Sequence, residues 1–593
     1  MKLLATILLL VGCASAACTG SSPTWTVTLN GGSISATDVQ TCVTNASDGD
    51  TINIVSGSGT WSSGVTISGK TVKIVGAGSG RIIATSTSTL TVGTGSKTLT
   101  IATVGLGSGA NPLVINNGDT LTIGELGVGG NSMTGTVTSY NSGTGSLVMN
   151  ITSSSGSCGS TGFSNCKRWN VSTPSSTTLY DAETSSPMFE VYESTTGHVD
   201  ISGIRFSSLS PGNSGTHMFN VDYTASGQQV ILHDMWITFN NAAAMDGSGN
   251  NTPIYWNINR GLMYRISFDD TDGSTTSAGA ISIQKDPRYN AWTETSYFGS
   301  LDTTDDHKVY IEDCDFHAFA FAGSTDFGAT MAQRYNLWDN TQGVGTHGPD
   351  SGPYGQRYFE AYDNTALFEG YNDGTTKPLN WWFLVRGGTY VITANKLPSI
   401  TSTDYGTKSD ISLHDNNLYD NSGTVHPCWG VGTSGGADYY TPRQVGYGYV
   451  TGLGTTSGSQ SSCTGLGCTG NNFSGSYDYA TYVGDSEPAY SWSNMDGGGT
   501  GRSLTESVAN SGDFNNCAAG DSASNYIQLN RDYFEGNTKS GYSPYTYPNP
   551  LRGGSNPNLP APSKGMMVSD LLTLPAAPVE KISNTVLTGA NKP

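Results

Sequence analysis

A repeated set of short strand-like runs limits what this chain can fold into more than any other feature. The runs align on one register position, usually two residues before a bulky side chain, at 204, 235, 266, 314, 336, 364, 395 and 416. Successive differences are 31, 31, 48, 22, 28, 31 and 21 residues; all except 48 fit one coil of a solenoid, and 48 fits one coil with a long loop or two coils. A single coil cannot bury its own apolar face, whereas a stack can. The repeat therefore predicts an all-β chain folded as a right-handed parallel β-helix.

The register position is asparagine in four of these coils, at Asn336, Asn364, Asn395 and Asn416. Strands of neighbouring coils lie about 4.8 Å apart, and stacked asparagines in cross-β packing hydrogen-bond to one another. We therefore expect a structural ladder of asparagines at this position, which requires no ligand.

The composition supports strands and excludes one class of partner. Only 12% of the residues are charged while 10% are aromatic, and apolar residues at helical spacing are almost absent. The net charge of -20 and the pI near 4.6 leave no basic face of the kind that nucleic acid requires. We expect no nucleic-acid partner.

Residues 1–16 have the pattern of an export signal, in which Lys2 precedes an apolar run too short to span a bilayer. Two endings fit: Leu10–Cys13 matches a bacterial lipobox, and Ala14–Ala16 matches an ordinary cleavage site. We expect a protein outside the cytoplasm, whether extracellular, periplasmic or on the outer surface, and either free or held by a lipid anchor. No later segment reads as transmembrane.

The ten cysteines fit an oxidising compartment and a disulfide framework, because no CxxC-type cluster suggests zinc. Cys18 and Cys42 are placed to close the N-terminal end, and Cys158 and Cys166 flank a loop. We expect Cys314 to be a buried free thiol. The remaining four can pair in three ways, and the sequence does not choose among them: Cys428, Cys463, Cys468 and Cys517.

We divide the chain into five parts by these patterns. They are the export signal (1–16), an N-terminal cap with the first coils (17–116), a small β insertion (117–172), the main β-helix with long loops (173–551) and a Pro/Ser/Asn-rich tail (552–593). A helical turn around Val39–Asn45 is expected to cap the solenoid. The tail is expected to be a linker or a strand that folds back along the β-helix.

Strand-like segments recur along the chain as DGDTINI, KTVKIVGAG, RYNLW, EAYDNT, RGGTYVITAN and EPAYSWSN. These segments resemble the pectate-lyase-like β-helix superfamily, as seen in bacterial secreted members without a known activity. The resemblance covers most of residues 36–551, and the insertion resembles small β modules of phage-tail and adhesion-type proteins. The resemblance implies the fold, and it implies lyase or hydrolase chemistry only loosely. Related hydrolases carry several catalytic motifs, and only THG at 346–348 is similar to one of them.

Scarce ionisable residues gather between the RYNLW and EAYDNT segments. We expect the loop 341–356 to leave the stack carrying His347 and Asp350, with the other charged groups on or beside neighbouring strands. His347 suits an acid or base near neutrality, and Glu360 suits a general acid or a metal ligand. The predicted catalytic set is Arg334, His347, Asp350, Arg357, Glu360 and Arg386.

Two further sets of residues suit binding. Asp269, Asp270 and Asp272 offer oxygen ligands to calcium, a possible cofactor, although their spacing differs from a recognised calcium loop. Aromatic rings exposed on a groove stack on sugar faces, whereas buried rings only pack. The predicted glycan-stacking residues are Trp381, Trp382, Tyr447, Tyr490 and Trp492.

The sequence leaves two functions open. The first is a secreted polysaccharide lyase or glycoside hydrolase, which needs the catalytic set on one outer face. The second is a non-catalytic glycan-binding adhesin or a phage-tail-like structural fibre. Both name a polysaccharide or cell-surface glycan as partner, and neither substrate nor oligomeric state follows from the residues.

Overall fold

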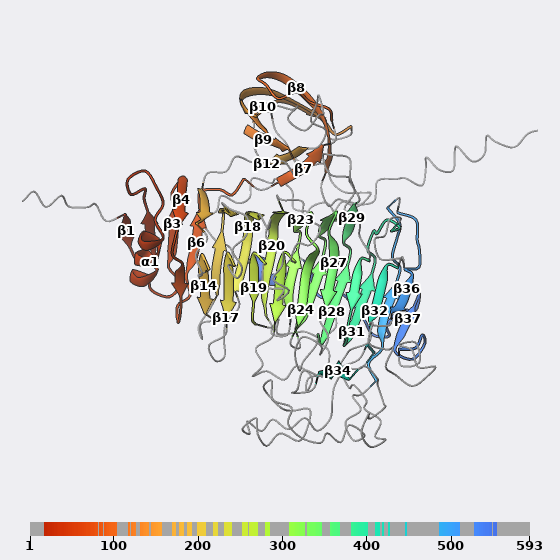
Figure 1. The fold of residues 1–593 in the computed structure, drawn as a ribbon. Helices are drawn as coiled ribbons and strands as arrows, with labels where there is room; N and C mark the ends of the chain where they lie inside the picture. The colour runs from red at the N-terminus through yellow and green to blue at the C-terminus, as the bar shows by residue number, and fades with distance from the viewer. Residues whose placement is uncertain are drawn as a thin grey trace, which may run out of the picture.

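The protein is described from a computed structural model, in which a long stack of parallel strands forms the body (Figure 1). The residues that the structure describes are 17–80, 82–86, 88–103, 117–118, 120–125, 131–141, 144–156, 169–172, 177–182, 187–192, 198–208, 217–222, 230–239, 252–258, 260–270, 279–284, 308–326, 329–346, 356–367, 381–400, 409–414, 418–419, 425–426, 445–446, 486–497, 499–509, 527–547 and 549–553.

Mostly parallel strands form two sheets that enclose one interior, which confirms the predicted parallel β-helix. The larger sheet bends at tight turns, and its two halves are here named walls A and B; the smaller sheet is wall C. Strands β18 and β20 are long and run from wall A into wall B. The strands of wall A are β2 (Thr24–Val27), β3 (Thr51–Ile54), β6 (Lys73–Gly76), β15 (Val199–Ser202), β18 (Val230–Phe239), β20 (Gly261–Asp270), β22 (Val309–Glu312), β25 (Thr330–Arg334), β28 (Tyr358–Tyr362), β31 (Thr389–Thr393), β35 (Ala489–Trp492) and β37 (Tyr533–Glu535).

Wall B continues each coil after a tight turn, and wall C completes it. Besides the ends of β18 and β20, wall B contains β4 (Gly57–Trp61), β13 (Thr177–Asp181), β16 (Arg205–Ser208), β23 (Asp315–His317), β26 (Leu337–Asp339) and β29 (Thr365–Leu367). Wall C contains β5 (Val65–Ile67), β14 (Phe189–Tyr192), β17 (Phe219–Asp222), β19 (Ile254–Trp256), β21 (Ile281–Gln284), β24 (Phe321–Asp326), β27 (Gln342–Thr346), β30 (Phe383–Val385), β32 (Ile411–His414) and β36 (Glu506–Ala509).

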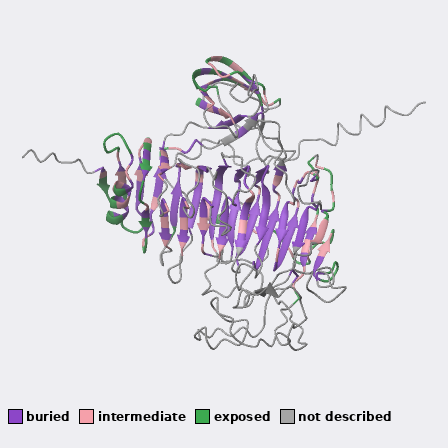
Figure 2. Cartoon of the chain, viewed as in Figure 1, coloured by how far each residue is buried: buried purple, intermediate pink, exposed green. Residues whose placement is uncertain are grey.

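The interior is apolar over most of its length, and Figure 2 shows the walls as almost continuously buried. Inward side chains of successive coils stack on one another, as Phe268 does on Phe316 with ring centroids 4.8 Å apart. Cys314 lies in this core as a buried free thiol, as predicted.

The turn from wall A to wall B repeats one backbone conformation. The residue directly before the register position has a φ between 52° and 71°, in the left-handed region. These residues are Gly203, Asp234, Arg265, Asp313, Tyr335, Asp363, Ala394 and Ser493. Seven of the eight predicted register positions are thereby confirmed, and the eighth turn lies at Asn494, while Asn416 is outside the described residues.

The asparagine ladder is confirmed at three predicted positions and extends to a fourth that the sequence did not indicate. The Nδ2 atom of Asn336 donates to Asn364 (3.1 Å), Asn364 to Asn395 (2.9 Å) and Asn395 to Asn494 (3.1 Å). Each side-chain oxygen also accepts from the backbone N–H of the asparagine one coil earlier. The ladder therefore satisfies buried backbone groups at the turns.

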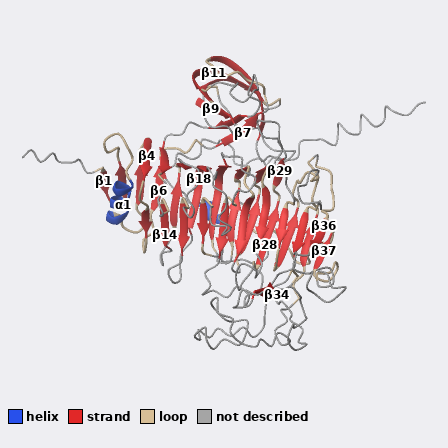
Figure 3. Cartoon of the chain, viewed as in Figure 1, coloured by secondary structure: helices blue, strands red, loops and turns tan. Residues whose placement is uncertain are grey.

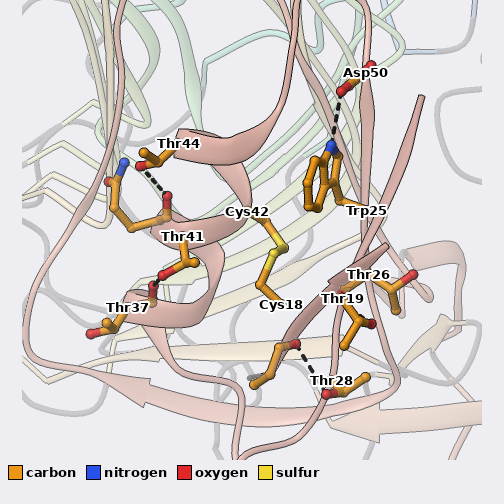
Figure 4. Close-up of a disulfide and its surroundings, with 12 residues drawn as sticks. Cys18, Thr19, Trp25, Thr26, Thr28, Thr37, Thr41, Cys42, Thr44 and Asp50 are labelled. Atoms are coloured by element: carbon orange, nitrogen blue, oxygen red, sulfur yellow. Dashed lines mark hydrogen bonds between the residues drawn. A yellow bond between two sulfur atoms is a disulfide. The ribbon is translucent and has the colours of Figure 1, made fainter. Parts of the chain in front are cut away.

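The N-terminal end is closed by helix α1 (Ala36–Asn45), which confirms the predicted cap (Figures 1 and 3). Ser35 begins it by accepting a hydrogen bond from the Thr37 N–H. Strand β1 (Cys18–Ser21) pairs with β2, and the predicted disulfide Cys18–Cys42 fastens β1 to the helix (Figure 4).

A separate six-stranded closed barrel leaves the solenoid after β6 and returns at β13, and it lies beside the stack in Figure 1. It begins at residue 82, earlier than the predicted 117, because β8 pairs antiparallel with β11 and closes the barrel. Its strands are β7 (Ile82–Ser86), β8 (Gly95–Thr103), β9 (Thr120–Glu125), β10 (Ser132–Asn141), β11 (Ser146–Ser155) and β12 (Trp169–Ser172).

Some predictions concern residues that the structure does not describe. The export signal and the other cysteines are among them: Cys13, Cys158, Cys166, Cys428, Cys463, Cys468 and Cys517. In the described part of the chain, no helix is both long and apolar enough to cross a membrane.

Candidate functional site

The outer face of wall A carries two of the charged residues that the sequence singled out, Arg334 and Glu360. Alternate residues of its strands point outward, and the strand register stacks them in two columns. One column contains Glu312, Arg334, Tyr362, Thr393 and Trp492, and the other contains Tyr310, Ala332, Glu360, Val391, Tyr490 and Phe534.

A segment near the C-terminus, residues 536–553 and here called the strap, runs back over this outer face. It includes a short 3-10 helix, Pro550–Gly553. Tyr545 and Leu551 of the strap pack on a buried outward cluster that includes Tyr310. The strap is not the tail of residues 552–593, for which the sequence predicted a linker or a strand that folds back. Residues after 553 lie outside the described part, so that expectation stays a prediction.

Arg334 is fully buried between the wall and the strap. Its guanidinium pairs with Glu312 and donates to the Tyr362 hydroxyl at 2.6 Å. It also donates to two backbone carbonyls of the strap, Tyr545 at 2.7 Å and Thr546 at 3.0 Å. These hydrogen bonds use its Nε and both terminal nitrogens, so the strap occupies the position that an anionic ligand would need.

The strap adds a cation and a phenol to the same network. Arg552 pairs with Glu312 (2.6 Å) and with Asp313 (2.5 Å), and the Tyr547 hydroxyl donates to Asp313 at 2.6 Å. The Tyr547 ring lies 3.7 Å from the Tyr335 ring, centroid to centroid. Removal of Glu312 would leave the buried Arg334 guanidinium without its carboxylate counterion.

Glu360 belongs to a second buried group on the same face. It pairs with Lys308, and its other oxygen accepts a hydrogen bond from the Tyr542 hydroxyl of the strap at 2.8 Å. Glu360 is 1% exposed. A carboxylate held in this way has no access to a polysaccharide outside the strap.

The pKa directions agree with fixed charges. Burial lowers the pKa of Arg334, but the neighbouring Glu312 carboxylate outweighs burial and raises it well above its ordinary value. Burial is also the main cause that raises the pKa of Tyr362 and Tyr542. These phenols therefore stay protonated and act as hydrogen-bond donors at neutral pH.

The structure brings Arg334 and Glu360 onto one face and separates the other described candidates from them. Arg357 precedes β28 and pairs with Glu487 at 2.8 Å. Arg386 lies on the turn after β30, and the nearby Gly388 has φ +68° and packs so closely on the Arg357 carbonyl that a Cβ would lie 2.4 Å from its oxygen. His347 and Asp350 lie outside the described residues.

The predicted glycan-stacking residues differ in exposure. Trp382 is a core residue with 0% exposure, and its Nε1 donates to the Pro398 carbonyl, so its ring is unavailable to a ligand. Trp381, Tyr490 and Trp492 are half-buried. Tyr447 lies outside the described residues.

Tyr490 and Phe534 form a partly exposed aromatic pair at the C-terminal end of the outer face. Their rings stack with centroids 5.1 Å apart at an interplanar angle of 11°, and the Lys539 ammonium lies 5.0 Å above the Tyr490 ring. Trp492 meets Tyr542 of the strap edge-on at 5.4 Å. Half-buried flat rings beside a cation form a surface to which a sugar ring can stack.

Two of the three predicted calcium ligands lie on a strand. Asp269 and Asp270 are consecutive residues of β20, so their side chains leave opposite faces of the strand, and Asp272 is outside the described residues. Asp269 accepts a hydrogen bond from Trp236 Nε1 at 2.5 Å. Among the residues that the structure describes, no three His, Cys, Asp or Glu side chains converge as a metal site.

Sequence reasoning missed the groups that pair with the predicted ones. Some of these partners lie on earlier coils, namely Lys308, Glu312 and Asp313. Others, Arg552 and the strap tyrosines, lie about two hundred residues after Arg334 in the sequence; Tyr545, for example, is 211 residues from Arg334. One signal was available: Tyr542, Tyr545 and Tyr547 recur closely in an otherwise polar segment.

Comparison with known proteins adds little. No protein family and no curated protein matches the chain. Among solved structures it is similar to the Gp54 tailspike of Acinetobacter baumannii bacteriophage AP22, in complex with A. baumannii capsular saccharide. Identity is 11% and the TM-score 0.17, over 65% of this chain; the chain spans 64% of the tailspike. This likeness is too low to carry an argument about the site.

Proposed function

We propose that this chain is an exported, non-catalytic β-helix that binds a glycan at a cell or particle surface. The observation that carries the proposal is the Tyr490–Phe534 pair beneath Lys539, which is half-buried, flat and positioned on the outer face. Trp492 lies on the neighbouring column and extends the aromatic surface. Rings arranged in this way suit the faces of sugar rings, and the ammonium suits a sugar hydroxyl or carboxylate.

The alternative function is a polysaccharide lyase or glycoside hydrolase. It loses support because Arg334 and Glu360 are consumed by Glu312, Lys308 and the strap. An acid or base must reach the proton it transfers. Kinship with the pectate-lyase-like superfamily, export, a lipid anchor and a calcium requirement remain parts of the proposal that rest on the sequence alone.

The test is a glycan array on the mature protein, followed by titration calorimetry with the glycans that bind. We expect the double variant Tyr490→Ala and Phe534→Ala to weaken binding about tenfold. The matched control is Tyr255→Ala, because Tyr255 is a half-buried ring on wall C, stacked on His217. Equal losses in both variants would remove the proposed surface.

A digestion assay on the same glycans separates the two functions. We expect no product release from wild type. Release of shortened or unsaturated sugars that Glu360→Gln abolishes would establish the enzyme and contradict the proposal.

A further inference from the structure

The outer face of wall B carries an arginine that lies on a tryptophan ring. Arg205 on β16 points outward, because the next residue, Phe206, belongs to the core. Trp236 occupies the same outward column one coil later, and the guanidinium carbon of Arg205 lies 3.9 Å from the centroid of its ring. Both side chains are half-buried, so their outer edges reach solvent.

Arg205 differs from other arginines of the solenoid in its lack of a carboxylate partner. Arg265 and Arg334 also lie over aromatic rings, but Arg265 pairs with Asp234 and Arg334 pairs with Glu312. Among the residues that the structure describes, no ion pair or hydrogen bond engages Arg205, and its Nε is buried without a hydrogen-bond partner.

The electrostatics of Arg205 show the same lack of compensation. Burial lowers its pKa, and the carboxylate of Asp269 offsets that effect only in part. A guanidinium stays charged in proteins, so a partly buried one without a counterion carries an uncompensated desolvation cost. An anion bound from solvent would supply the missing partner.

An unsatisfied hydrogen-bond acceptor lies at the edge of the same tryptophan. Trp236 donates from Nε1 to Oδ2 of Asp269 at 2.5 Å. Asp269 is 6% exposed, and its Oδ1 is buried without a hydrogen-bond partner. One indole ring therefore has a guanidinium on its face and a carboxylate at its edge, which brings free donors and a free acceptor close together.

We propose that Arg205, Trp236 and Asp269 form a second glycan site, on wall B, that takes a sugar carrying a carboxylate. A guanidinium matches a carboxylate with two parallel hydrogen bonds. The free Oδ1 of Asp269 accepts from a sugar hydroxyl, and the indole edge gives the ring of the sugar an apolar contact. The proposal rests on the proposed function only in taking a sugar as the ligand, since its residues and its wall are different.

The free groups favour an acidic sugar over two other ligands. A neutral sugar would satisfy the N–H groups of Arg205 but leave its charge without a counterion. An inorganic anion would supply the counterion but leave Oδ1 of Asp269 without a donor, and the two negative charges would repel each other. A sugar with one carboxylate and several hydroxyls meets both requirements.

The experiment is saturation-transfer NMR on the full chain, with sodium glucuronate as the probe and glucose and inorganic phosphate as comparison ligands. We expect a saturable glucuronate signal, and glucose should compete for the site about tenfold less well, as should phosphate. Arg205→Met should weaken glucuronate binding about tenfold or more, and Arg205→Lys less, because lysine keeps the charge but loses the planar fork. The Tm of Arg205→Met should not fall below that of wild type, because no ion pair is broken.

The matched control for net charge is Lys97→Met, because Lys97 lies on the barrel and bonds to Thr91 there. Its glucuronate binding should equal that of wild type, as should that of the Tyr490→Ala and Phe534→Ala double variant. A loss of glucuronate binding in that double variant but not in Arg205→Met would overturn this proposal and leave the first glycan surface standing. Equal binding of glucose and glucuronate, or no saturable signal, would overturn it as well.

The opposite result separates the two proposals. Glucuronate binding that requires Arg205, together with an array on which the Tyr490→Ala and Phe534→Ala double variant binds as wild type does, would support the wall B site and remove the aromatic surface of wall A.

Discussion

Two sets of buried polar side chains run along this solenoid, the asparagine ladder and the outer face of wall A, and they differ in which residues supply their hydrogen-bonding partners. The asparagine ladder uses the same residue in each coil, and each member bonds to the next one along the stack. The outer face of wall A uses different residues in each coil, and it is sealed only by the strap. The asparagine ladder therefore finds its hydrogen-bonding partners in adjacent coils, whereas the outer face of wall A needs partners from a segment distant in sequence.

The difference separates two roles that scarce charged residues can have in a low-charge chain. In the sequence, Arg334 and Glu360 looked like members of an active site. In the structure they belong to ion pairs buried under the strap. Breaking one partner of such a pair strands a charge in a dry environment, whereas breaking one ladder member strands neutral groups. Variants on the outer face of wall A are therefore expected to lose more stability than variants in the asparagine ladder.

The largest effect is expected at the covered face. Arg334→Met leaves Glu312 with Arg552 as its cationic partner and leaves the Tyr545 and Thr546 carbonyls without the Arg334 donor. It should lower the free energy of unfolding by about 3 kcal/mol, the low end of the range for breaking a buried ion pair, measured by urea denaturation. The matched control is Arg531→Met, because Arg531 also pairs with a carboxylate, that of Asp532, but is 45% exposed. The control should cost about 0–1 kcal/mol. Equal costs would mean that the strap does not seal Arg334.

The ladder should respond less strongly. Asn364→Ala removes the acceptor for the Asn336 N–H and the donor to the Gln333 carbonyl. The expected total loss is about 2–3 kcal/mol, near the low end of the range for two unsatisfied buried groups, because water can enter the space left by the side chain and pair with them. Asn30→Ala, at an exposed asparagine that bonds to Asp38, is the control and should be near neutral. A neutral Asn364→Ala would show that the ladder is not needed.

A smaller effect is expected from one hydroxyl of the strap. Tyr547→Phe removes the hydrogen bond to Asp313 but keeps the ring on Tyr335. The expected cost is about 1.5–3 kcal/mol, as for a bond to a charged group, and it should be at the low end because Arg552 still pairs with Asp313. Tyr192→Phe, which loses a similar bond to Glu190 on the outer face, is expected to cost less. The reverse order would contradict burial under the strap.

The smallest effect should be a slope of stability with pH. Burial lowers the pKa of His233, but Asp200 and Asp234 outweigh it and raise it to about 9. The folded state therefore keeps a proton that the unfolded state releases above about 6.5. This stabilisation is complete below the unfolded pKa and is lost as pH rises through about 9. Tm measured across this range should fall, and less steeply in His233→Gln; identical slopes would reject the assignment.

The sequence predicted what repeats within a coil or between neighbours. The register positions, the ladder at Asn336, Asn364 and Asn395, and the capping helix follow from spacing and local chemistry. The Cys18–Cys42 disulfide also links segments that are close along the chain.

What the sequence could not predict depends on pairing over long separations. The alternating strands β7 and β8 look alike whether they join a coil or a barrel, so the insertion was placed too late. Arg334 and Glu360 were correctly placed on one outer face, but their burial follows from the strap, whose contacts have no period. Trp382 was predicted to stack on a glycan, but it directly precedes β30 and lies in the core of the solenoid.

The claim that the charged face of wall A is a sealed structural element is tested most directly by carboxyl footprinting. The native protein is treated with a water-soluble carbodiimide and an amine, and modification is read by mass spectrometry at Glu312, Glu360 and the exposed Asp48. We predict that Asp48 reacts quickly while Glu312 and Glu360 react only when the protein unfolds. Modification of Glu360 at the rate of Asp48 would mean that the outer face is an open groove. It would contradict the sealed face and favour the polysaccharide lyase or glycoside hydrolase function instead.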